Sequence, residues 1–114
     1  MTLRRDLFDA ADDELLLEFG IGLSGGVGAF PLPDDEYRKK AREWLEKRVE
    51  EAKRVLCRNN TIRHLSKDGF TAELVAAVAA LLESIVVGTA AAPLAILLCK
   101  QGVVGLCSGI WDQK

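Results

Sequence analysis

The sequence predicts an all-α protein, a compact bundle of four to five helices with an apolar C-terminal helical hairpin at its centre. Two N-terminal segments place apolar residues at helical spacing, and the C-terminal half is almost free of charge. Between positions 69 and 111 the charged residues are Glu73, Glu83 and Lys100. A chain of 114 residues, 49% of them hydrophobic, is large enough for one domain, residues 1–114, with its own core.

The first two elements are an acidic helix and a loop. Apolar residues at helical spacing predict a helix over about residues 5–19, and these residues are Leu7, Phe8, Ala11, Leu15 and Phe19. Gly20 is expected to end this helix, because glycine is common just after a helix C-terminus. Residues 20–33 are rich in glycine and proline and are predicted to form a loop.

The charged segment 34–58 is predicted to be a long amphipathic helix. Its apolar residues occupy one arc of the helical wheel: Tyr37, Ala41, Trp44, Leu45, Val49, Ala52, Val55 and Leu56. Asp34 is the expected N-cap. Salt bridges at i,i+4 spacing are expected for the pairs Glu36–Lys40, Glu43–Lys47 and Glu50–Arg54. Thr61 is then expected to cap a short turn over residues 61–67, which Gly69 ends.

Two apolar helices are predicted in the C-terminal half. The first covers residues 70–87, with Thr71 as its cap and Gly88 at its end. One face of it is aliphatic and the other is rich in alanine, so we expect neighbours on both sides and a central position. The second covers about residues 91–109, and Pro93 is tolerated in its first turn. Its regular part is placed at about residues 91–101, and Gly102, Gly105 and Gly109 indicate that the remainder is a last, distorted helix ending near Trp111.

The net charge of −2 hides three unlike segments. Residues 1–33 have a net charge of −4, residues 34–67 a net charge of +4, and residues 68–114 a net charge of −2. The basic residues of helix 34–58 are interleaved with glutamates, whereas a surface that follows a phosphate backbone is nearly free of acids. A nucleic-acid-binding module built on this helix is therefore only a remote alternative.

The cysteines predict a reducing compartment. Cys57, Cys99 and Cys107 are an odd number, they form no CxxC pair, and each lies among apolar residues. We expect them to be free thiols packed as small hydrophobic side chains. Together with an N-terminus that lacks the apolar core of a signal peptide, this predicts a cytoplasmic location.

Motifs with chemical meaning occur in unsuitable surroundings. Gly20-x-Gly22-x-x-Gly25 fits a dinucleotide fingerprint and Gly22-x-Ser24-x-Gly26 a nucleophile elbow, but both need a preceding strand. His64, the single histidine, has no orienting group, and Asp9, Asp12 and Asp13 are expected to form a solvated acidic face. We therefore predict no catalytic, cofactor-binding or metal-binding residue, no cofactor and no enzyme activity.

Three residues are predicted to contact a partner. Arg48 falls within the apolar arc of helix 34–58, where its charge must reach solvent, pair with an acid such as Glu83, or bind another chain. Trp44 lies at the edge of the same arc, and Trp111 lies near the chain end. Trp and Arg are enriched among the residues that dominate binding energy.

These observations predict a small, non-enzymatic interaction protein, an adaptor or accessory subunit that binds a protein partner or itself. The alternative is a membrane-anchored or membrane-active protein that uses the apolar hairpin 70–111. Residues 84–99 form an uncharged run of sixteen, whereas a spanning helix needs about 20 residues. The two N-terminal helices each have an apolar stripe that the hairpin can cover, which favours a core over a membrane.

Overall fold

The computed structural model describes residues 10–24, 32–86 and 88–111, and within these ranges it contains no strand. The predicted all-α class is confirmed. The described α-helices number six, more than the predicted four to five. The elements are α2 (Asp12–Leu23), α3 (Asp34–Cys57), α4 (Asn60–Leu65), the 3-10 helix η1 (Ser66–Asp68), α5 (Ala72–Leu82), α6 (Gly88–Gln101) and α7 (Val103–Trp111).

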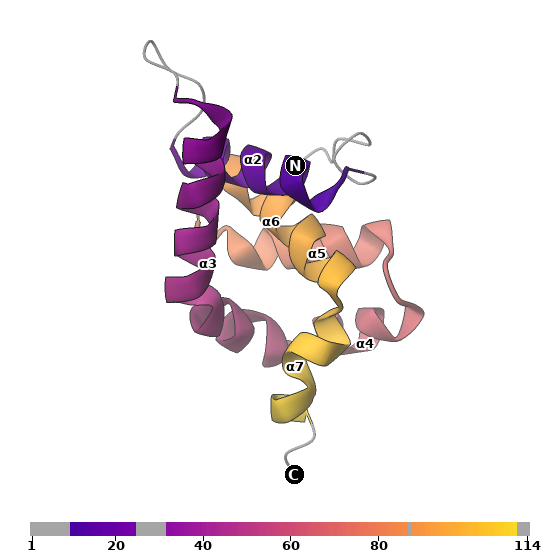
Figure 1. The fold of residues 1–114 in the computed structure, drawn as a ribbon. Helices are drawn as coiled ribbons and strands as arrows, with labels where there is room; N and C mark the ends of the chain where they lie inside the picture. The colour runs from indigo at the N-terminus through magenta and orange to yellow at the C-terminus, as the bar shows by residue number, and fades with distance from the viewer. Residues whose placement is uncertain (1–9, 25–31, 87, 112–114) are drawn as a thin grey trace.

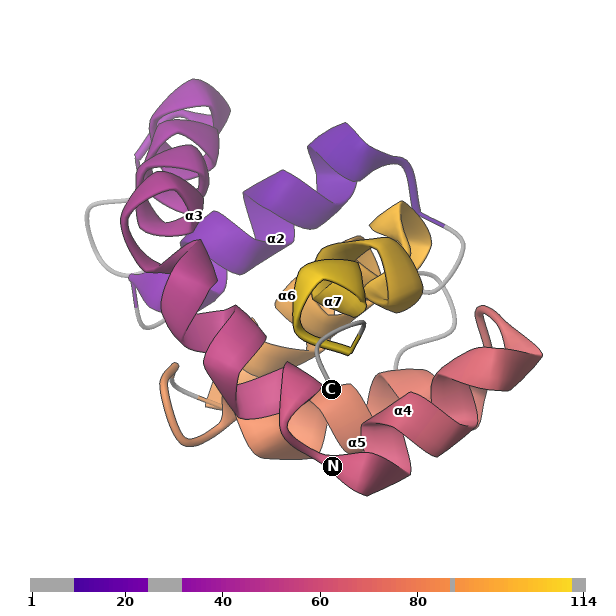
Figure 2. The same ribbon diagram turned by 90° about the horizontal axis from the view of Figure 1, so that it is seen from below.

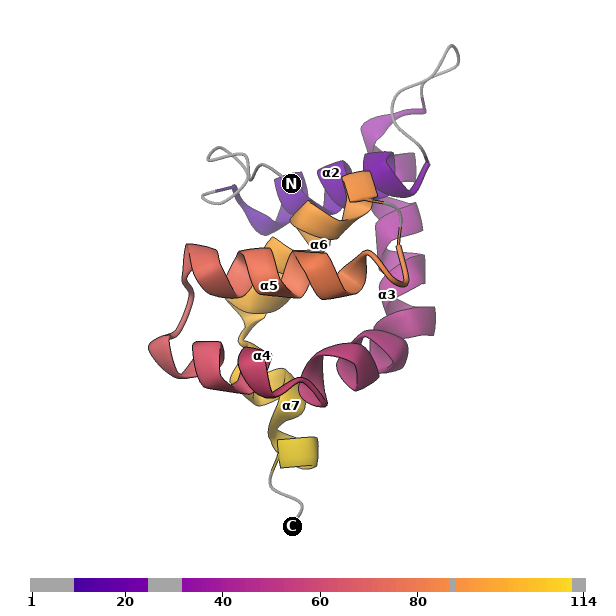
Figure 3. The same cartoon turned by 180° about the vertical axis from the view of Figure 1, so that it is seen from behind.

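The helices are arranged around α6, which packs against α2 on one side and α5 on the other (Figure 1). Helix α3 runs along the side of this stack and packs mainly on α2 (Figures 1 and 2). Figure 3 shows α4 and α7 at the end of the molecule opposite α2. The core therefore joins elements from both halves of the chain.

Helix α2 continues past Gly20, where the sequence predicted its end. Gly20 and Gly22 are helical and buried, and the helix ends at Leu23. Glycine is needed at position 20 because α3 approaches it closely: a Cβ atom there would lie 1.9 Å from the carbonyl oxygen of Tyr37. Residues 1–9 of the predicted acidic helix and residues 25–31 of the predicted loop lie outside the described ranges.

Gly20→Ala should therefore destabilise the protein, by about 2–3 kcal/mol, because backbone atoms of α3 must move away from the added methyl group. Gly109→Ala is the matched control. It also lies in a helix, but a Cβ there meets nothing within 4 Å, so alanine should raise stability by up to about 1 kcal/mol. Urea denaturation measures both changes. Equal effects of the two substitutions would contradict the close approach of α2 and α3.

The charged helix forms as predicted, with bounds Asp34–Cys57. Its N-cap is Pro33, one residue before the predicted Asp34. The predicted i,i+4 salt bridges are wrong. The described part of α3 instead forms pairs at i,i+3 spacing, Arg38–Asp35, Arg48–Glu51 and Lys53–Glu50. Exposed pairs of either spacing contribute only tenths of a kcal/mol, so this difference has little effect on stability.

Two caps define the middle of the chain. Asn59, not Thr61, caps α4, because its side-chain oxygen accepts a hydrogen bond from the Ile62 amide at 3.1 Å. Gly69 ends the following 3-10 turn with a positive φ of 81°, as predicted. Thr71 caps α5 as predicted, and its Oγ1 accepts from the Leu74 amide at 3.1 Å.

Helix α5 is shorter and more peripheral than predicted. It ends at Leu82, and Gly88 begins the next helix instead of ending this one. Its aliphatic face is buried, but Ala76 and Ala80 on the opposite face are exposed, so no described helix covers that side. The expected central position of helix 70–87 is wrong.

The central helix is α6, in which every side chain from position 90 to position 99 except Ala92 is buried and none is charged.

 Ala92 is thus the single half-buried position in that stretch. The predicted helix 91–109 is broken at Gly102, whose φ of 103° is left-handed and favours glycine. As a result α6 and α7 meet at an angle of 75°, and the predicted two-helix hairpin is replaced by three helices.

A disulfide joins α7 to the end of α3. The sulfur atoms of Cys57 and Cys107 lie 2.06 Å apart, 50 positions from each other in the chain. The prediction of free thiols is therefore wrong for these two cysteines, and only Cys99 is a free, buried thiol. Disulfides persist mainly in oxidising compartments, so the bridge removes the thiol argument for a cytoplasmic location.

Candidate functional site

Trp44 sits on the core but reaches the surface. Its ring meets the ring of Phe19 edge-on, with the centroids 5.3 Å apart and the planes at 85°. Phe19 is fully buried, whereas Trp44 is half-buried. Edge-to-face aromatic pairs prefer this geometry, so Phe19 on α2 holds the indole of Trp44 in one orientation while part of it remains exposed.

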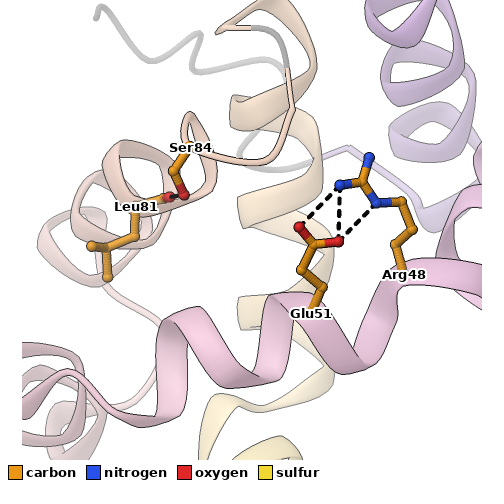
Figure 4. A network of polar contacts seen from close by, with 4 residues as sticks. All are labelled: Arg48, Glu51, Leu81 and Ser84. Atoms are coloured by element: carbon orange, nitrogen blue, oxygen red, sulfur yellow. Dashed lines mark hydrogen bonds and ion pairs between the residues drawn. The ribbon is translucent and has the colours of Figure 1, made fainter.

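Arg48 lies beside Trp44 on the next turn of α3. Its guanidinium stands 5.6 Å from the centre of a Trp44 ring, within the range of a cation–π contact. Arg48 also donates two hydrogen bonds to Glu51, from Nε to Oε2 at 2.9 Å and from Nη2 to Oε1 at 3.0 Å (Figure 4). Since its side chain is still 42% exposed, Arg48 is oriented by its neighbours and remains accessible.

The predicted pair between Arg48 and Glu83 is wrong. Glu83 follows the end of α5 and is exposed, so it has no need of a buried partner. Glu51 lies one turn along the same helix, and the paired side chains stay at the protein surface. Figure 4 shows that the hydroxyl of Ser84, the residue after Glu83, donates a hydrogen bond to the carbonyl oxygen of Leu81.

An open groove of about 370 Å³ lies on this part of the surface, between the end of α2 and the middle of α3. Its lining combines an aromatic ring, an aliphatic side chain and charges, and consists of Leu23, Lys40, Glu43, Trp44, Lys47 and Arg48. We call it the Trp44 groove. Two of the three predicted contact residues, Trp44 and Arg48, therefore meet in one place.

The surroundings of the Trp44 groove are basic. Residues 38–48 carry six basic side chains and only two acidic ones, Glu43 and Glu46. Lys40 lies one turn before Trp44 and Lys47 one turn after it, and both are exposed. Neither lysine forms a salt bridge with the residues that the structure describes. The groove thus offers an oriented indole between free positive charges.

Trp111, the third predicted contact residue, lies elsewhere and serves the fold. Its indole Nε1 donates a hydrogen bond of 2.7 Å to the carbonyl oxygen of Cys57, next to the disulfide. The guanidinium of Arg63 stands 5.7 Å from its ring centre. Trp111 is half-buried by these contacts, which hold the end of α7 against α3 and α4.

The residues with possible catalytic or metal chemistry remain apart. Ser24 follows α2, and its hydroxyl donates to the carbonyl oxygen of Gly20. His64 is exposed on α4, and the cysteine before it in the chain, Cys57, has its sulfur bound in the disulfide. Asp12 forms a salt bridge with Lys100 at 3.5 Å, and Asp9 lies outside the described ranges. The described residues contain no group of three or more side chains placed to hold a metal ion.

Cys99 lies at a second, smaller cavity. This cavity of about 140 Å³ is mostly apolar and is lined by Ser66, Gly69, Phe70, Leu74, Cys99, Gly102, Val103 and Val104. Burial raises the pKa of the Cys99 thiol to about 12, because removal from water disfavours the charged thiolate. Since the thiolate is the nucleophile, this burial makes Cys99 a poor nucleophile.

The apolar C-terminal half is divided among the short helices α5, α6 and α7. No single described helix has both the length and the apolar character needed to cross a membrane. Ala90–Gln101 and Val103–Trp111 meet the requirement only when taken together, across the 75° bend at Gly102.

A scan against protein-family models and searches of curated proteins and of solved structures found no match to this chain.

Proposed function

We propose that this chain is a non-enzymatic interaction protein that binds another protein chain through the Trp44 groove. The observation that carries the proposal is the Phe19–Trp44–Arg48 arrangement, in which an aromatic and a guanidinium group are oriented at an accessible surface. Interface hot spots are rich in Trp and Arg that are held in place before binding, because little side-chain entropy is then lost.

The alternative of a membrane protein that uses residues 70–111 has less support. The helix that would enter the membrane, α6, supplies much of the core, including Leu94, Ile96 and Leu97. Moving α6 into lipid would expose the apolar faces of α2 and α5 that pack on it. We therefore advance the interaction protein as the function and take a protein chain as the partner.

Affinity capture with quantitative mass spectrometry tests this proposal. The groove variant is Lys47→Ala with Arg48→Ala, and the matched control is Lys53→Ala with Arg54→Ala on the same helix. We expect a partner that the wild-type protein and the control retain equally and that the groove variant loses by about tenfold or more, which corresponds to about 1.4 kcal/mol.

The two double variants remove the same charge and the same kind of side chain from α3, so a general effect of charge or helix propensity would change both. Circular dichroism must show equal melting temperatures for the two double variants. A partner retained equally by all three proteins would contradict binding through the Trp44 groove.

A further inference from the structure

We propose that the Trp44 groove binds the acidic face of α2 from a second copy of this chain. This inference rests on the proposed function, since it names the occupant of the same groove. The face consists of Asp13 and Glu14 with Leu17 one turn later, which helical spacing places on one side of α2.

The acidic face has free charges that match those of the groove. Asp13 and Glu14 are exposed, and their carboxylates make no salt bridge or hydrogen bond with the described part of the chain. Helix α2 carries no basic residue along its whole length. On the other side, Lys40 and Lys47 are exposed and likewise unpaired among the described residues.

Each surface also supplies an apolar side chain one turn from its charges. Leu17 is half-buried, and it is not among the side chains packed against the core. Trp44 lies between Lys40 and Lys47 at one-turn spacing on either side. A helix that places Leu17 on the indole therefore brings the carboxylates of Asp13 and Glu14, both one turn before Leu17, to the lysine on one side of Trp44.

Arg48 adds a further donor at the edge of this contact. Its Nε and Nη2 bond to Glu51, while its Nη1 has no hydrogen-bond partner among the described residues. A carboxylate that reaches Nη1 would gain a charge-assisted hydrogen bond without any change in the Arg48–Glu51 pair.

Charge reversal tests this contact. Lys40→Glu with Lys47→Glu reverses the groove, and Asp13→Lys with Glu14→Lys reverses the face on α2. Sedimentation velocity at low salt should show that the wild-type protein self-associates and that each variant alone does so at least tenfold more weakly. An equimolar mixture of the two variants should associate again, because each reversed surface then meets a complementary one.

The controls separate this contact from other effects of charge. Arg54→Glu with Arg58→Glu makes the same charge change at exposed positions beyond the groove and should leave self-association unchanged. Raising the salt concentration from 0.05 to 0.5 M should weaken wild-type association, because salt screens pairs of exposed charges. Trp44→Phe should weaken it less than Trp44→Ala, since the phenyl ring keeps an apolar contact.

Two results would overturn the inference. One is a wild-type protein that stays monomeric at millimolar concentration and low salt. The other is self-association that the mixture of the two charge-reversed variants fails to restore, although both variants melt as the wild-type protein does. Either result leaves the proposed function open to its own test. If the Lys47→Ala and Arg48→Ala variant still loses a captured partner, the groove binds another protein and only the second copy of this chain is excluded as its occupant.

Discussion

Replacing Cys57 and Cys107 together by alanine should lower the free energy of unfolding by about 4 kcal/mol. The bridge closes a loop across 50 positions of the chain, and a cross-link of that length removes about this much conformational freedom from the unfolded state. Natural domains are stable by only about 5–15 kcal/mol, so the loss is a large share of the total. Chemical denaturation without reductant measures it.

Cys99→Ala is the control for the bridge. It removes a buried cysteine but leaves Cys57 and Cys107 joined, so it should cost only the packing of one small side chain. A reductant should destabilise the wild-type and Cys99→Ala proteins by similar amounts and leave the double alanine variant unchanged. Thiol labelling of the unfolded, unreduced protein should modify Cys99 alone. Labelling of all three cysteines would show that the bridge is absent.

Phe19→Ala should lower the free energy of unfolding by about 3–5 kcal/mol, the range observed when a buried aromatic side chain is removed. Phe19 is fully buried and joins α2 to the base of Trp44. The change should also release the Trp44 indole, so its fluorescence should shift to longer wavelength. Thermal or chemical unfolding gives the first result, and emission spectra of the folded variant give the second.

Phe19→Leu provides the comparison. Leucine keeps most of the buried volume and should cost less than about 1.5 kcal/mol, but it removes the aromatic contact with Trp44. If Phe19 orients Trp44, both variants should weaken binding at the Trp44 groove. Binding that is unchanged in Phe19→Leu would show that the aromatic contact contributes stability but does not organise the site.

Much of the secondary structure followed from local pattern. The bounds of α3 were predicted to within one residue, because its apolar arc repeats over six turns and acids occupy its first turn. Thr71 was predicted as a cap for a similarly local reason, since its hydroxyl bonds an amide three residues away. The end of α2 was missed because Gly20 is an acceptable helix stop by local criteria, and only the tertiary structure shows that this glycine leaves room for the backbone of Tyr37.

The candidate site was predicted in part. Trp44 and Arg48 were identified from their residue types and their positions on the helical wheel, and both line the groove. The choice of Glu51 over Glu83 as the partner of Arg48 could not be predicted, because it depends on where α5 ends in space. Trp111 has the same residue type as Trp44, and only its hydrogen bond to Cys57 shows that it supports the fold.

The amino-acid sequence by itself determined the helical class, the long charged helix and the apolar C-terminal half, because these depend on spacing along a few turns. The tertiary structure decided which cysteines pair, which helix is central and which tryptophan borders an open groove. Those features require residues such as Cys57 and Cys107 to meet across 50 positions, and the bend at Gly102 sets where α7 lies. Local periodicity carries no information about such distant contacts, since many packings of the same helices bury the same apolar faces.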